Sequence, residues 1–230
     1  MIRQTEVLQL RTGRLQPLAD SGATTGIYKQ CVDTAFLSKD GLEQDEHGDT
    51  RHHGGPEKAL HHFAADHYAL LKERLPASAA GHCYPGAFGE NLVTQGLTET
   101  EVCAGDIYKL GGAILQVSQP RQPCWRLNAR FELADMSRRL QNTHRTGWYY
   151  RVLQPGQICR GDLLILEQRP NPEWSLSRIL NVLYNATLDS EALAGMAELS
   201  QLSLSLRTLA RNRLETGQVE DWENRLFGPK

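Results

Sequence analysis

Residues 106–119 read DIYKLGGAILQVSQ, two apolar runs joined by Gly111 and Gly112. Each run has the length and the β-branched or aromatic residues typical of a strand. A Gly-Gly pair between two such runs indicates a tight hairpin, because glycine adopts the positive φ angles that the favoured hairpin turns require. The stretch therefore predicts two antiparallel strands, at 106–110 and 113–119.

Short strand-like segments continue on both sides of this hairpin. They lie at 5–10, 26–32, 34–37, 88–94, 147–156 and 161–170. Helices are expected at 133–142 and at 57–75, where five residues recur at helical spacing: Leu60, Phe63, His67, Leu70 and Leu71. Strands dominate and no βαβ rhythm repeats, which favours a mainly β barrel with interspersed helices over a doubly wound sheet.

The pattern changes after Pro170 and Pro172. Three amphipathic stretches follow with short breaks: SLSRILNVLYNAT, SEALAGMAELS and LSLSLRTLARNRLE. A helical unit of roughly sixty residues buries little core by itself, so we expect it to dock on the barrel. The sequence thus predicts a β-barrel domain at 1–168 and a helical domain at 169–230.

The composition is that of an ordinary globular protein, with 40% hydrophobic and 23% charged residues. A net charge of −2 provides no global basic field for nucleic acid. No run of about 18 apolar residues predicts a membrane span. The N-terminal stretch lacks an apolar core of signal-peptide length, and the five cysteines are widely spaced. We therefore expect a cytoplasmic protein with free thiols.

The segment after the hairpin, SQPRQPCWRLN at 118–128, carries the strongest chemical signal. Arg121 and Arg126 flank Cys124, and a nearby arginine favours the thiolate, which is the form that attacks or ligates a metal. Pro120 and Pro123 stiffen the backbone around the sulfur. We interpret the other cysteines as small buried thiols without a chemical role: Cys31, Cys83, Cys103 and Cys159.

Three roles for Cys124 stay open on the residues alone. A nucleophile requires a base beside the thiol, for which His53 and His144 are candidates. A metal ligand requires a soft metal, and a metal cofactor that carries a phosphate would satisfy the thiol and the arginines together. The third role is incidental, in a binding module whose arginines capture an anion.

Six of the eight histidines fall between positions 47 and 67: His47, His52, His53, His61, His62 and His67. The HExxH motif is absent, so a histidine zinc site is not predicted. His67 is expected to be buried and hydrogen-bonded, and His61 and His62 to lie on the surface. His53 precedes Gly54-Gly55-Pro56, which is compatible with an anion contact at a helix start or with a simple turn.

Four segments carry a family resemblance together: HGGPEKAL (53–60), GAFGENL (86–92), GDIYKLGGAILQVSQPRQPCWRLN (105–128) and NTHRTGWYYRVLQPG (142–156). They resemble the MOSC domain, named for the C-terminal domain of molybdenum cofactor sulfurase. The likeness is closest to the YiiM-like bacterial branch, linked to resistance against N-hydroxylated purines. The C-terminal stretches are similar to the three-helix unit of that branch.

The resemblance implies a MOSC-type β-barrel in which Cys124 binds molybdenum or carries sulfur. It implies the molybdenum cofactor, molybdopterin, with His53 assisting proton delivery. The candidate contacts to the cofactor or substrate are Arg121, Arg126, Asn91 and Asn128.

The implied function is reduction of N-hydroxylated substrates such as purine bases, which uses two electrons and two protons and removes one oxygen as water. The sequence has no GxGxxG fingerprint and no iron–sulfur spacing, so a separate flavoprotein reductase is expected as electron donor. The alternative is a sulfur carrier or cofactor-trafficking protein with a persulfide on Cys124. A homodimer stays open.

Overall fold

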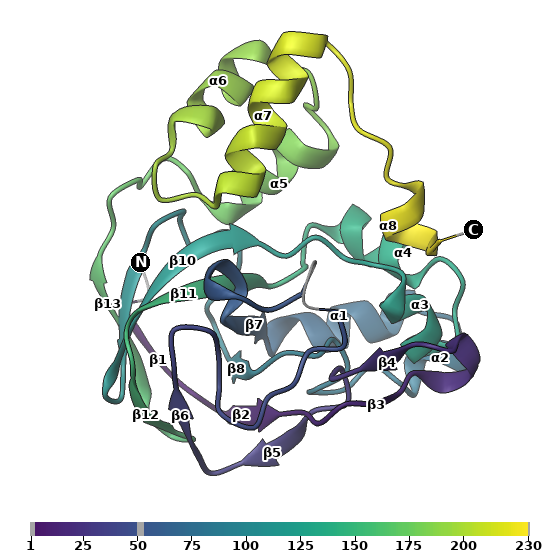
Figure 1. Cartoon of the computed structure of the whole chain (residues 1–230), viewed down its shortest axis with the longest axis vertical. Helices are drawn as coiled ribbons and strands as arrows, with labels where there is room; N and C mark the ends of the chain where they lie inside the picture. The colour runs from purple at the N-terminus through teal and green to yellow at the C-terminus, as the bar shows by residue number, and fades with distance from the viewer. Residues whose placement is uncertain (1–2, 50–52, 230) are drawn as a thin grey trace.

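The computed structural model describes residues 3–49 and 53–229, and a curled mixed sheet forms its lower part in Figure 1. The strands of this sheet are β1 (Gln4–Glu6), β2 (Gln9–Thr12), β5 (Gln30–Val32), β7 (Leu60–Ala64), β8 (Leu92–Thr94), β9 (Ile107–Leu110), β10 (Ala113–Pro120), β11 (Trp148–Gln154) and β13 (Leu163–Gln168). Their order is β1-β13-β9-β10-β11-β7-β8-β2-β5. Among these strands β7 and β8 are parallel and the other neighbours antiparallel. The mainly β prediction is confirmed as a half-barrel.

Two short ribbons and several helices complete the chain. The ribbons pair β3 (Gln16–Pro17) with β4 (Thr24–Thr25) and β6 (Thr34–Leu37) with β12 (Gly156–Cys159). The helices are the 3-10 turns η1 (Ala19–Ser21) and η2 (Pro56–Lys58), then α1 (Asp66–Arg74), α2 (Ala77–Ala80), α3 (Arg126–Phe131), α4 (Met136–Thr143), α5 (Leu176–Tyr184), α6 (Ser190–Glu198), α7 (Leu204–Thr216) and α8 (Glu223–Phe227). No helix within the described residues is long and apolar enough to span a membrane.

The hairpin predicted around Gly111 is confirmed as β9 and β10, with Ala113 opposite Leu110. Gly111 has a φ angle of +53°, and a Cβ atom there would lie 2.5 Å from Asp162 Oδ2. Glycine is therefore required for both the turn and the close approach. Strand β10 pairs with β11, and the pairing has a register shift between Val117 and Gln119, shortly before the segment that holds Cys124.

The helix predicted at 57–75 is wrong in its first half, which forms the strand β7. This strand lies between β11 and β8 and all five of its residues are buried, so its sequence lacks the alternation of a half-exposed strand. His61 and His62 are therefore buried rather than exposed, and Leu70 on α1 is 42% exposed. The prediction for His67 is confirmed: it is buried, and its Nε2 lies 2.7 Å from Glu99 Oε2.

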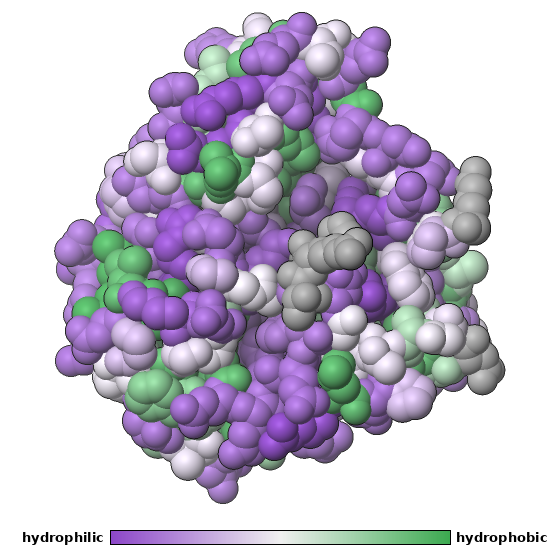
Figure 2. Space-filling view, viewed as in Figure 1, coloured by the Kyte–Doolittle hydropathy of each residue, from purple (hydrophilic) through white to green (hydrophobic). Residues whose placement is uncertain are grey.

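The three helices α5, α6 and α7 form the predicted C-terminal helical unit, at the top of Figure 1. Its docking is confirmed, because Leu176 and Ile179 of α5 share one apolar core with Leu115 and Val117 of β10. After α7 the chain returns to the sheet, where α8 packs against α4. The face drawn in Figure 2 is largely hydrophilic, with its apolar residues in small separate groups.

Candidate functional site

A pocket of about 600 Å³, its open mouth included, lies beside the end of β10. Five segments that are far apart in the sequence line it, at 25–29, 46–49, 53–61, 88–91 and 121–126, and Tyr149 completes it. The pocket contains five of the six residues that the sequence singled out. Only Asn128 lies outside its lining.

Cys124 lies in this pocket directly before α3. Its Sγ is 3.4 Å from His53 Nε2, so of the two candidate bases it is His53 that meets the thiol. His53 Nδ1 in turn lies 3.9 Å from Asp49 Oδ2, which also accepts from Arg126 Nη2 at 3.4 Å. His144 ends α4, and its ring faces Tyr184.

His53 is a neutral imidazole at neutral pH. Burial, aided by the charges of Arg126, Lys58 and Arg121, lowers its pKa to about 3. His53 therefore does not titrate near neutrality in the protein as it stands. A neutral ring still accepts or donates a hydrogen bond at Nε2, so His53 is suited to relaying a proton rather than to storing one.

The pocket wall is rich in cations. Lys29 forms a buried ion pair with Asp45, while Arg121 and Lys58 face the same space. Burial lowers the pKa of Lys58, and the nearby Cys124 and Asp49 oppose this effect. Arg121 is only 6% exposed, and its Nη1 has no hydrogen-bond acceptor among the described residues. A buried guanidinium nitrogen without an acceptor, at the wall of a pocket, is typical of a site that receives an anion.

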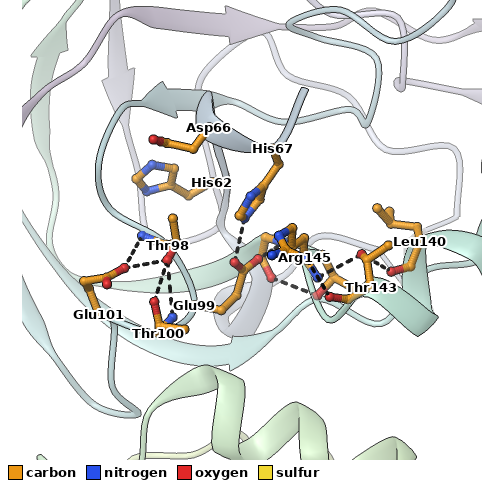
Figure 3. A network of polar contacts seen from close by, with 12 residues as sticks. His62, Asp66, His67, Thr98, Glu99, Thr100, Glu101, Leu140, Thr143 and Arg145 are labelled. Atoms are coloured by element: carbon orange, nitrogen blue, oxygen red, sulfur yellow. Dashed lines mark hydrogen bonds and ion pairs between the residues drawn. The ribbon is translucent and has the colours of Figure 1, made fainter. Parts of the chain in front are cut away.

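Hydrogen bonds connect the Arg121 backbone to a buried polar network, of which Figure 3 shows the contact between Glu99 and His67. The Arg121 backbone N–H donates to Gly147 O at 2.9 Å, and Gly147 N–H donates to Glu99 Oε1 at 2.7 Å. Glu99 also meets His67 of α1 through its second oxygen. Gly147 has a φ angle of +75°, and a Cβ there would lie 2.3 Å from His62 O. The network thus holds Arg121 beside Gly147, which lies two residues before Tyr149.

The two predicted asparagines have different places. Asn91 lines the pocket, where its amide donates to Arg11 O and Asp45 Oδ2 and accepts from His61 N. It therefore holds the pocket wall together. Asn128 lies on α3 and uses both ends of its amide elsewhere: Nδ2 donates to Leu226 O, and Oδ1 accepts from Ser137 N.

Several pocket residues were not predicted from the sequence, and three of them have chemically active side chains: Tyr149, Lys58 and Asp49. Tyr149 is one residue from the strongly patterned Trp148 and Tyr150, and only the sheet shows that it faces the pocket. Lys58 belongs to the HGGPEKAL segment, so its motif was a usable signal. Asp49 lies four residues before His53 in a polar loop that offers no pattern.

The residues present suit a metal cofactor that carries a phosphate. No three His, Cys, Asp or Glu side chains in residues 3–49 and 53–229 could hold a metal ion together, and His52 lies outside this described part. Since these residues offer no set of three such ligands, a metal at Cys124 would need further ligands, which a cofactor could supply. The unsatisfied Arg121 nitrogen and the neighbouring cations are the groups that such a cofactor's phosphate would need.

The remaining cysteines lie outside the pocket lining. Cys83 and Cys103 are buried, as expected, and burial raises the pKa of each thiol to about 11. Cys31 is exposed and Cys159 is half-buried, so the prediction of burial is wrong for Cys31 and only partly right for Cys159. All five thiols are free.

Comparison with known proteins identifies both parts of the chain. Residues 49–164 match the family described as MOSC domain, and residues 174–217 match the YiiM-like, 3-alpha helix domain. Protein YiiM of Escherichia coli is 37% identical over 94% of this chain and 96% of its own length. A Gibberella moniliformis protein named Reductase is 40% identical over 91% of this chain, which spans 37% of that longer protein.

The fold agrees with these matches. The crystal structure of YiiM from Escherichia coli superposes with a TM-score of 0.84, at 31% identity in the structural alignment, over 99% of this chain and all of that one. The family match, the identity and the superposition extend across both the sheet and the helical unit. The chain therefore belongs to the MOSC domain family, in the YiiM-like branch that carries the C-terminal three-helix domain.

Proposed function

We propose that this chain is a molybdenum-cofactor-dependent reductase of N-hydroxylated compounds, N-hydroxylated purine bases among them. The observation that best supports this proposal is a single thiol, Cys124, in a cationic pocket where Arg121 Nη1 has no acceptor among the described residues. MOSC domains are generally associated with the molybdenum cofactor, and one relative is named Reductase. Both facts support the proposal.

In this proposal Cys124 would ligate the metal. Arg121, Arg126 and Lys58 would bind the phosphate and pterin oxygens, since they line one space and carry positive charge. Asn91 would keep the wall in place through its three hydrogen bonds. When bound, the cofactor would supply the two-electron chemistry that converts R–NHOH, two electrons and two protons into R–NH2 and water.

The chain itself would handle the protons. Burial raises the pKa of Tyr149, so its phenol stays protonated and donates a hydrogen bond to the substrate. Neutral His53 would pass a proton between solvent and the pocket. The electrons would come from a separate flavoprotein reductase, which stays a prediction.

The test is to purify the protein from a host that makes molybdenum cofactor. Molybdenum and pterin are measured per chain, and reduction of 6-N-hydroxylaminopurine is followed with a reduced dye as electron donor. Cys124→Ser should abolish turnover and molybdenum retention, whereas Cys159→Ser, outside the pocket lining, should retain both. Turnover by protein free of molybdenum and pterin, or full turnover by Cys124→Ser, would disprove the proposal.

A sulfur carrier is the second candidate, favoured by the 3.4 Å contact between Cys124 Sγ and His53 Nε2. His53 Nε2 at this distance could hydrogen-bond the thiol as its thiolate attacks the outer sulfur of a donor persulfide, which moves that sulfur to Cys124 and releases the donor as a thiolate. The two functions are separable by mass spectrometry of the purified chain. A persulfide on Cys124, together with loose cofactor binding and no turnover from the reduced dye, would favour the carrier.

A further inference from the structure

The chain after α7 forms a C-terminal tail, residues 218–228, that crosses from the helical unit back to the sheet (Figure 1). It contains α8 and lies beyond residue 217, where the match to the 3-alpha helix domain ends. The tail packs against α3 and α4, next to the segment that carries Cys124. The tail therefore connects the two parts of the chain at the candidate site.

Arg225 of this tail binds the peptide groups on either side of Cys124. Its Nη1 donates to Pro123 O at 2.7 Å, and its backbone oxygen accepts from Trp125 N–H at 2.8 Å. Its Nη2 donates to Gln141 Oε1 of α4 at 2.8 Å, which fixes the direction of the guanidinium. One residue thus holds the chain immediately before and immediately after the thiol.

The tail has its own anchor on the same two helices. Leu226 is fully buried, and its carbonyl accepts from Asn128 Nδ2 at 2.7 Å and from Ser137 Oγ at 2.6 Å. Gly228 lies against the Trp125 ring, where an added Cβ would be 3.4 Å away. Asn128, expected from the sequence to contact a cofactor, instead binds the tail that supports the Cys124 segment.

We infer that Arg225 is a positioning residue for Cys124, and that the C-terminal tail sets the direction of the thiol into the pocket. Both peptide groups next to Cys124 are bound by a residue about a hundred positions away, so docking of the tail holds the backbone on both sides of the sulfur. This inference does not rest on the proposed function, because a metal ligand and a sulfur carrier need the same orientation.

The test uses cofactor-free full-length protein and the variant Arg225→Gln. The rate of alkylation of Cys124 by iodoacetamide is measured by peptide mass spectrometry and divided by the rate for exposed Cys31 in the same molecule. Arg225→Gln should raise this ratio about tenfold, because a charge-assisted hydrogen bond to the segment is lost. Asn128→Asp, which removes the donor to Leu226 O, should raise the ratio in the same direction.

Arg178→Gln is the matched control. Arg178 also donates to a backbone oxygen, Glu173 O at 3.0 Å, and lies over the Trp174 ring, but it is in the helical unit away from the pocket lining. Its variant should leave the ratio unchanged. Alkylation of buried Cys83 would reveal a variant that has unfolded, in which case Asn128→Asp decides. A ratio that is unchanged or lower in the folded tail variants overturns the inference and leaves the tail a purely stabilising role.

Discussion

Replacing Arg121 by methionine should stabilise the cofactor-free protein while it weakens anion binding. Arg121 is 94% buried, since 6% of it is exposed, and its Nη1 has no acceptor in the described part of the chain. It also lies among other positive groups, since its charge and that of Arg126 both help to lower the pKa of His53. Methionine fills a similar space without a charge to desolvate.

The magnitude follows from the contacts that change. A buried donor without an acceptor costs about 1–3 kcal/mol. Loss of the hydrogen bond between Arg121 and Tyr149 costs about 1 kcal/mol. The backbone bond from Arg121 N to Gly147 O is retained. The expected net effect is therefore a gain of about 1 kcal/mol in the free energy of unfolding, which raises the Tm by about 2–4 °C for a chain of this size.

The assay combines urea unfolding with an inorganic phosphate titration. Phosphate at ten times its Kd stabilises a protein with one site by about 1.4 kcal/mol. The parent protein should show this gain as phosphate rises at constant ionic strength, and Arg121→Met should show much less of it. Together the two results distinguish the loss of stability caused by a buried cation without an acceptor from the contribution of that cation to phosphate binding.

Arg11→Met is the control, because Arg11 is satisfied by Gln9 Oε1 and Lys29 O, each at 2.8 Å. That variant should lose about 1–2 kcal/mol. The reasoning is refuted if Arg121→Met also loses more than about 1 kcal/mol, or if phosphate stabilises it as much as it stabilises the parent protein.

Three further predictions concern the sheet beneath the pocket. Gly147→Ala should cost about 3 kcal/mol or more in urea unfolding, because its φ angle is +75° and the new Cβ would meet His62 O. Glu99→Ala should cost about 2–3 kcal/mol and reduce the phosphate effect, since Gly147 N–H and His67 lose their acceptor; an unchanged phosphate effect would show that Glu99 does not position Arg121. Burial lowers the pKa of His62 to about 3. Below about pH 6.5 the unfolded state therefore gains a proton that the folded state does not. The free energy of unfolding then decreases by about 1.4 kcal/mol for each unit by which the pH is lowered. His62→Gln should remove one such proton from the slope measured between pH 6.5 and 4.5 in urea titrations, and an unchanged slope would contradict the neutral buried state of His62.

The parts of the fold that could be predicted are those determined by neighbouring residues. The hairpin at Gly111 depends on a local turn, and the helices of the C-terminal unit depend on their own apolar periodicity. The prediction for strand β7 was wrong because both faces of the strand are buried. Its apolar run therefore joins that of α1, and the two together resemble one long helix. Helix α3 was missed because it has only six residues, too few to show a helical periodicity, and it follows the rigid Pro123 segment.

The residues of the candidate site likewise include some that a local pattern indicates and others that only long-range contacts bring together. Cys124 and Arg121 could be singled out because their chemistry and stiff backbone stand together in one loop. The contact with His53 could be listed only among alternatives, since 71 positions separate the two residues. The contact between Asn128 and Leu226 could not be predicted, because Leu226 lies 98 positions away in a tail with no recognisable pattern.

Other buried arginines in the molecule have hydrogen-bond acceptors that compensate their charge, in contrast to Arg121. Arg213 is 2% exposed, and it binds Glu220 and three backbone oxygens. Arg169 binds buried Asp106 through two nitrogens. Both cations are compensated by the fold itself. Arg121 Nη1 and Arg130 Nε have no hydrogen-bond partner among the described residues, but of these two arginines it is Arg121 that lines the pocket. Because Arg121 shares this pocket with Cys124, an anion bound there would supply the missing acceptor and compensate the charge.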